Sequence, residues 1–184
     1  MFDLSMERGS DLGRVLDGCP PGLAGWRDFE RAALAALRYL FVPPLSEPYV
    51  QPRSYSGIDR RDAIFPNRVT DTNQPWGLLR QDLEARLIPV EFKNYDRTDI
   101  AKNEVDQARN YLKHSMGRLA IICCNKNPSQ AAYRRRNGIY SEERKMILFM
   151  TTSQLKKMLD MKDRGKDPAT YVVDCVEKFL IEHE

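Results

Sequence analysis

Hydrophobic residues recur along this chain with two different periods, and the change between them predicts where helices and strands lie. Over Trp26–Phe41 the apolar positions return at helical spacing, which predicts a helix that Pro43-Pro44 ends. The uninterrupted apolar runs RLAIICCN and KMILFMT are typical of strands covered on both faces. Another strand is expected over Arg86–Lys93, so the pattern predicts a buried sheet combined with amphipathic helices.

Weaker signals place the remaining elements. Short β-like segments are expected in YVQPRSY and GIDRRDAIF, followed by a turn-rich stretch with one helical turn around Trp76–Arg80. Further helices are predicted from Thr98 or Asp99 to about Ser115, over QAAYRRRN to Asn137-Gly138, from Ser153 to near Gly165, and from Asp167-Pro168 onward. This order predicts an α/β fold, with a mixed central sheet and helices on both faces. Residues 1–24 are expected to form an arm or short helix before one domain over residues 25–184.

The composition fits one soluble domain of ordinary size. The chain has 184 residues, of which 42% are hydrophobic and 30% are charged. No apolar run approaches the roughly 18 residues that a membrane span needs, and the N-terminus lacks an apolar signal-peptide core. A cytoplasmic protein without a membrane partner is therefore expected. The net charge of +3 permits nucleic-acid binding but does not argue for it.

Cysteine and histidine usage excludes several kinds of site. The four cysteines show no CxxC spacing, and adjacent Cys123 and Cys124 would point to opposite faces of a strand. They are interpreted as small buried side chains rather than zinc ligands or disulfides. Only two histidines are present, His114 and His183, which argues against a His-rich metal site or a Ser-His-Asp triad.

The strand IPVEFK carries two charges inside an otherwise apolar run. Because side chains alternate across a strand, Glu91 and Lys93 share one face, opposite Val90 and Phe92. Charges in such a run are costly to bury unless they have partners or a function. One interpretation is an edge strand with a solvated ion pair, and the other is a functional site.

Other polar positions favour the functional interpretation. Asp62 heads a segment expected to form a strand beside Glu91, although Asp59 competes for the same role. Glu30 falls on the apolar side of the predicted first helix, where an acid needs a partner. Gln107 and Tyr111 lie one turn apart at the edge of the next helix.

Taken in order, Glu30, Asp62, the EFK of Glu91–Lys93 and the QARNY of Gln107–Tyr111 resemble the PD-(D/E)xK nuclease superfamily. The stretches GWRDFE, GIDRRDAIF, VEFKNYD and QARNYL look like restriction-endonuclease-like domains of bacterial defence and DNA-processing proteins. The resemblance covers about residues 25–160, with Arg61 where the family has the proline of its PD pair. It implies a restriction-endonuclease-like fold, with a mixed four- to five-stranded sheet flanked by helices on both faces.

The resemblance also implies an endonuclease that hydrolyses DNA with Mg²⁺, for which Mn²⁺ would substitute. Asp62 and Glu91 would then be metal ligands, and Glu30 a ligand or an acid behind them. Lys93 would orient or activate the attacking water, while Gln107 and Tyr111 would support the site or contact phosphate. Mg²⁺ takes oxygen ligands and keeps several waters, so two or three carboxylates suffice.

Basic residues are the candidates for contacts with DNA phosphates, which give sequence-independent affinity. These candidates are Arg60, Arg61, Arg109, Lys113, Arg118, Arg134, Arg135 and Arg136. For the run Arg134–Arg136, a solvated charged helix face is the alternative interpretation. By analogy with the family, a homodimer is expected, or a module of, or partner to, a larger ATPase or sensor protein. Two alternative functions stay open: a non-catalytic nucleic-acid or protein-binding module on the same fold, and an RNase or branched-DNA resolvase.

Overall fold

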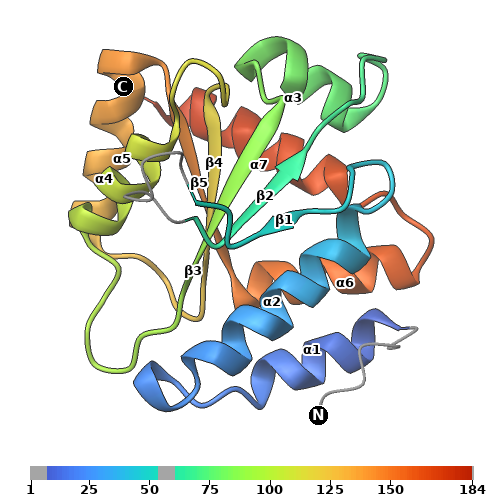
Figure 1. The fold of residues 1–184 in the computed structure, drawn as a ribbon, viewed down its shortest axis with the longest axis vertical. Helices are drawn as coiled ribbons and strands as arrows, with labels where there is room; N and C mark the ends of the chain where they lie inside the picture. The colour runs from blue at the N-terminus through green and yellow to red at the C-terminus, as the bar shows by residue number, and fades with distance from the viewer. Residues whose placement is uncertain (1–7, 54–60, 184) are drawn as a thin grey trace.

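The computed structural model describes residues 8–53 and 61–183, which form one five-stranded mixed sheet between layers of helices (Figure 1). The strands follow one another across the sheet in chain order: β1 (Tyr49–Val50), β2 (Ala63–Pro66), β3 (Leu87–Lys93), β4 (Leu119–Cys124) and β5 (Met146–Thr151). The pairs β1–β2 and β2–β3 are antiparallel, whereas β3–β4 and β4–β5 are parallel. The α/β class and the mixed sheet are therefore confirmed.

Seven α-helices and a 3₁₀ turn surround the sheet within the described residues. They are α1 (Gly9–Asp17), η1 (Gly22–Ala24), α2 (Trp26–Phe41), α3 (Pro75–Leu83), α4 (Lys102–Tyr111), α5 (Gln130–Glu143), α6 (Thr152–Asp163) and α7 (Ala169–Glu182). Helices α4 and α5 cover one face of the sheet, and α2, α6 and α7 cover the other (Figure 1). None of the described helices is both long enough and apolar enough to cross a bilayer.

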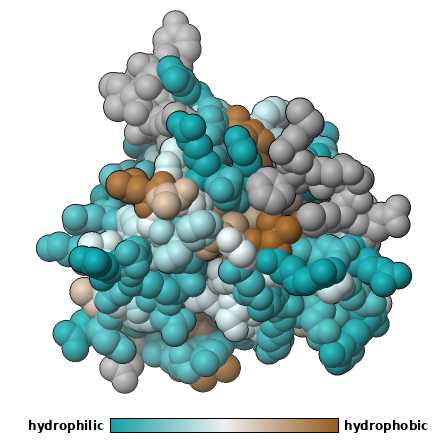
Figure 2. Space-filling model, turned by 90° about the horizontal axis from the view of Figure 1, so that it is seen from below, coloured by the Kyte–Doolittle hydropathy of each residue, from teal (hydrophilic) through white to brown (hydrophobic). Residues whose placement is uncertain are grey.

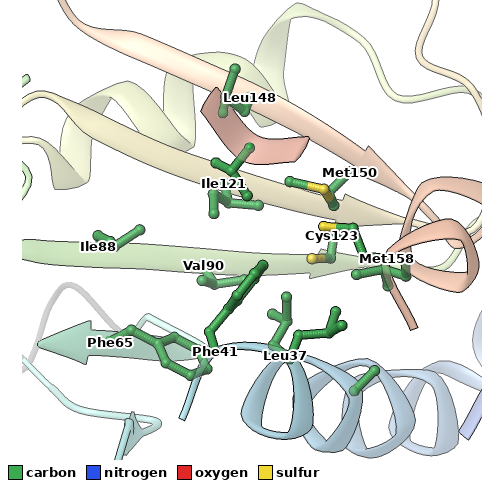
Figure 3. Packing of buried hydrophobic residues seen from close by; sticks show 14 of the residues in the cluster. Leu37, Phe41, Phe65, Ile88, Val90, Ile121, Cys123, Leu148, Met150 and Met158 are labelled. Carbon is green, nitrogen blue, oxygen red and sulfur yellow. The ribbon is translucent and has the colours of Figure 1, made fainter. Parts of the chain in front are cut away.

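Two hydrophobic cores follow from the alternation of side chains along the central strands. Ile121 of β4 belongs to the larger core beneath α2, α6 and α7, and its neighbour Ile122 belongs to the smaller core beneath α4 and α5. Side chains of α2, including Leu37 and Phe41, lie against the sheet near Val90 (Figure 3). Burial of one such side chain is worth about 1.5–3 kcal/mol, so α2 is held firmly against β3.

The N-terminal segment joins this core. Helix α1 packs on α2 and α6, and its Leu12 and Leu16 are buried in the larger cluster. Asp163 at the end of α6 accepts hydrogen bonds from the backbone N–H groups of Gly9 and Ser10. These bonds cap the start of α1, because the first N–H groups of a helix have no partner within it.

Several predicted helix boundaries are wrong. Helix α4 begins at Lys102 instead of Thr98 or Asp99, and the Glu104 carboxylate accepts the backbone N–H of Ala101 at its start. Helix α5 continues through Gly138 to Glu143, because tertiary packing overrides the local break signal of Asn-Gly. Helix α6 is capped by Thr151, whose hydroxyl accepts the backbone N–H of Gln154, rather than by Ser153.

The four cysteines are free thiols, but the prediction that all are buried is wrong for Cys19 and Cys175, which are only partly buried. Cys123 and Cys124 are fully buried in β4 and belong to different cores. Burial raises the pKa of the Cys124 thiol to about 12, so this side chain acts as a small hydrophobe.

Candidate active site

The antiparallel register of β2 and β3 brings Asp62 beside Glu91. Ala63, the first residue of β2, pairs with Val90, so Asp62 just before it comes opposite Glu91. The Asp62 Oδ2 atom accepts a hydrogen bond of 2.9 Å from the backbone N–H of Phe92. This bond continues the row of hydrogen bonds between β2 and β3 by one residue, and it holds the Asp62 carboxylate against β3.

Glu91 is a buried acid in a central strand. Only 3% of the residue is exposed, and β3 lies between β2 and β4, which rules out the edge strand with a solvated ion pair. The pKa of Glu91 is raised to about 7, first by burial and then by the negative charge of Asp62, while the Lys93 ammonium lowers it. Its Oε1 atom is buried without a well-aligned hydrogen-bond partner among the described residues. The other oxygen, Oε2, pairs with the ammonium group of Lys93.

Lys93 connects the acids to helix α4. Its Nζ lies 3.2 Å from Glu91 Oε2 and 2.9 Å from Gln107 Oε1, so it donates to both. The Gln107 amide in turn donates to the hydroxyl of Tyr111 over 2.7 Å. Gln107 and Tyr111 lie one helical turn apart on α4, which faces the same side of the sheet as Glu91.

Tyr111 and Arg61 close this cluster. Burial raises the pKa of the Tyr111 phenol to about 12, with the nearby Glu91 carboxylate adding to the effect. The Arg61 guanidinium lies 5.3 Å from the centre of the Tyr111 ring, which is the geometry of a cation–π contact. Arg61 is buried, and its Nε has no hydrogen-bond partner in the described part of the chain. The Arg61 guanidinium thus lies against the Tyr111 ring, whose hydroxyl is bonded to Gln107.

Glu30 is linked to Asp62 through Gln51. Its Oε1 accepts a hydrogen bond of 3.1 Å from Gln51 Nε2, and the backbone N–H of Gln51 donates to the carbonyl oxygen of Asp62. Residues 8–53 and 61–183 contain no group of three or more His, Cys, Asp or Glu side chains able to hold a metal ion. The predicted convergence of three acids is therefore reduced to the pair Asp62 and Glu91, with Glu30 linked through Gln51. Asp59 and Arg60 lie outside the described residues.

The other described basic candidates have partners elsewhere or are exposed on the surface. Arg109 pairs with Glu143 of α5, and Arg135 pairs with Asp106 of α4. Arg136 is stacked among the rings of Tyr133, Phe149 and Phe179, and burial lowers its pKa. Arg118 pairs with Glu84, while Lys113 and Arg134 are exposed on the surface. Among the basic candidates within residues 8–53 and 61–183, only Arg61 has a recorded contact with this cluster, through the Tyr111 ring.

Sequence reasoning missed Asn94, the residue after Lys93. Asn94 is buried and donates its side-chain N–H groups to the carbonyl oxygens of Pro20 and Gly22, over 2.8 and 3.2 Å. These bonds tie the η1 turn to the end of β3. A polar residue just after a buried strand was the only available signal, and its partners are more than 70 residues away in the sequence.

The residues present suit a hard divalent cation. Asp62 and Glu91 supply carboxylate oxygens, and Mg²⁺ needs only one or two carboxylates because it keeps water ligands. The buried Oε1 atom of Glu91 would gain a partner in such an ion. Comparison of the chain with protein-family models, curated proteins and solved structures finds no match.

Proposed function

We propose that this chain is a divalent-metal-dependent endonuclease that hydrolyses phosphodiester bonds of DNA on a restriction-endonuclease-like fold. The observation that carries the proposal is the set of Asp62, Glu91 and Lys93 at one point of the sheet. Two acids from neighbouring strands meet there, and the ammonium group lies 3.2 Å from one of them. The antiparallel start and parallel continuation of the sheet support the fold assignment.

Asp62 and Glu91 would hold Mg²⁺ or Mn²⁺ through their carboxylate oxygens. When bound, such an ion would polarise the phosphate and lower the pKa of a water molecule. Burial is the main cause of the raised pKa of Glu91, and repulsion by the Asp62 carboxylate is the second. A cation between them would remove this repulsion and favour the ionised form of Glu91.

Lys93 would position the attacking water or a phosphate oxygen. Two of its N–H groups are directed at Glu91 and Gln107, which leaves one N–H for a ligand. Gln107, which is itself oriented by its hydrogen bond to Tyr111, holds the Lys93 ammonium in a fixed orientation. The Arg61 guanidinium would add positive charge next to the phosphate, where it opposes the build-up of negative charge during hydrolysis.

The test compares metal-dependent cleavage of supercoiled plasmid DNA by the wild-type chain and by the variants Asp62→Asn, Glu91→Gln and Lys93→Met. Each variant removes one charge at nearly constant size. Asp160→Asn is the matched control, because this acid pairs with Arg164 on the exposed side of α6. Cleavage should need Mg²⁺ or Mn²⁺, survive in the control and fall at least about 100-fold in the three site variants.

Metal binding is measured beside activity, by calorimetric titration with Mn²⁺. The wild-type chain and Lys93→Met should bind the ion, whereas Asp62→Asn and Glu91→Gln should bind it weakly. Cleavage that persists undiminished in all three site variants would exclude this site. Binding of DNA without metal dependence, unaffected by the three substitutions, would instead favour a non-catalytic binding module.

A further inference from the structure

A second feature lies directly beside Lys93. A hollow of about 700 Å³ opens between the residues that follow β3 and the turn that precedes α2. This volume lies within the range of about 300–1,000 Å³ that is usual for ligand sites. Lys93 contributes to its wall, together with Leu23, Trp26, Phe92 and Asn94. The hollow and the proposed active site therefore share Lys93.

Large apolar side chains stand exposed at this hollow. Leu23 is 92% exposed and Trp26 is 41% exposed, although the spacing of apolar residues predicts that Trp26 packs inward with the rest of α2. The face of the protein on which α1 lies is mainly hydrophilic, with small separate hydrophobic patches (Figure 2). An exposed tryptophan beside a candidate catalytic lysine points to a ligand that has an aromatic face.

The turn that carries these side chains is held in place by its own structure. Asn94 binds the carbonyl oxygens of Pro20 and Gly22. A Cβ atom at Gly25 would lie 1.9 Å from the carbonyl oxygen of Pro20, so the chain passes there only because the residue is glycine. The η1 turn and the start of α2 are thus fixed relative to β3. We call this surface, which carries Leu23 and Trp26, the platform. Because it is preorganised, a ligand that binds to it loses little affinity to ordering the protein.

The charges around the platform suit a phosphate backbone. The Arg27 guanidinium lies 5.2 Å from the centre of the Trp26 ring, and Arg97 and Lys93 also line or border the hollow. The one acid in the wall is Asp96, and nearby Lys126 pairs with Asp99 and donates to the carbonyl oxygen of Asp96. Aromatic faces flanked by basic groups are the usual means by which proteins bind single strands of nucleic acid.

We infer that the hollow holds an unstacked nucleobase of the substrate strand, which stacks on Trp26 with Leu23 at its edge while the adjoining phosphate lies at Lys93. This inference rests on the proposed function and names its substrate class as DNA with unpaired nucleotides next to the cut. Inside a duplex the faces of a base are covered by its neighbours, so Trp26 could reach one only after unstacking. Single-stranded or frayed DNA offers that face at no such cost.

Intrinsic fluorescence tests the inference in the presence of EDTA, so that no DNA is cleaved. The chain has two tryptophans, and Trp76 is only 1% exposed, so quenching by DNA reports on Trp26. A single-stranded oligonucleotide should quench the emission and bind more tightly than the blunt duplex of the same sequence. Trp26→Ala should weaken single-strand binding about 10-fold or more, whereas Trp26→Phe should retain most of the affinity because it keeps a stacking face.

Leu23→Ala is compared with Ile181→Ala, because both remove an exposed aliphatic side chain and Ile181, 83% exposed, lies on α7. The first should weaken single-strand binding, and the second should leave it unchanged. Binding of the two Trp26 variants is followed by fluorescence anisotropy of labelled DNA. Equal affinity of the wild-type chain for single strand and duplex, or unchanged binding by Trp26→Ala, would overturn the inference.

The two proposals fail separately in these assays. The chain could bind single strands in a manner that depends on Trp26 and yet show no metal-dependent cleavage. That result would support the stacking of a base on Trp26 and contradict the proposed nuclease activity. Alternatively, the wild-type chain and Trp26→Ala could cleave duplex DNA equally well with metal. That result would support the proposed nuclease activity and contradict the stacking of a base on Trp26.

Discussion

The Asp62 carboxylate accepts the backbone N–H of Phe92, the residue that lies between Glu91 and Lys93 in β3. This hydrogen bond therefore holds Asp62, the residue before β2, against Glu91 and Lys93 of β3. The same bond gives Asp62 a structural role beside any role in metal binding, and the two roles can be separated by the choice of substitution.

Asp62→Asn should keep the fold but lose the charge, because the amide oxygen of asparagine can still accept the N–H of Phe92. Asp62→Ala leaves that N–H unsatisfied and should lower the free energy of unfolding by about 1–3 kcal/mol. Urea denaturation measures both values, and plasmid cleavage measures activity. Equal stability of the two variants would show that the hydrogen bond to Phe92 does not contribute.

The raised pKa of Glu91 should make stability depend on pH. Its pKa is about 7 in the folded chain against an ordinary value of 4.5, so the folded state binds more protons than the unfolded state between these values. The free energy of unfolding should therefore be larger below this window and fall as pH rises through it, by at most about 3 kcal/mol. Urea denaturation in EDTA over this range should show the loss in the wild-type chain and not in Glu91→Gln.

Bound metal should reverse this trend. Carboxylate ligands must lose their protons to bind Mg²⁺, so the ion should stabilise the chain more at about pH 8 than at about pH 6. Thermal unfolding with Mg²⁺ and with EDTA measures the difference at each pH. A stabilisation by Mg²⁺ that is independent of pH, or that survives in Glu91→Gln, would place the ion elsewhere.

Lys93→Met removes the ammonium and keeps the aliphatic stem. Since the Lys93 charge lowers the pKa of Glu91, its loss should raise that pKa further and move the pH window of the stability loss upward. The variant should still bind Mn²⁺ near neutral or alkaline pH but cleave DNA about 100-fold more slowly. Cleavage at the wild-type rate would remove Lys93 from the mechanism.

Two glycines in helices should respond oppositely to alanine. A Cβ atom at Gly77 of α3 would lie 1.9 Å from the carbonyl oxygen of Asp71, so Gly77→Ala should destabilise the chain by about 1–3 kcal/mol. A Cβ at Gly138 of α5 would meet no atom within 4 Å beyond its own helical backbone, so Gly138→Ala should stabilise the chain by about 0.5–1 kcal/mol. Thermal unfolding of both variants checks the signs, and destabilisation by Gly138→Ala would contradict the continuous helix α5.

Local pattern predicted the parts of this protein that depend on one element at a time. The alternation of IPVEFK places Glu91 and Lys93 on one face of β3, and Asp62 heads a strand that pairs with it. The period of a strand or helix decides which side chains share a face, and it is readable from neighbouring residues alone.

Only the tertiary structure decided how elements distant in the sequence meet. Glu30 is directed to Gln51, Arg135 pairs with Asp106, and Asn94 binds the turn at Pro20, each across 20 or more residues. The exposure of Trp26 likewise depends on what packs against the first turn of α2. Periodicity defines the apolar face of an element but not what covers it, because coverage is set by the packing of whole helices against the sheet.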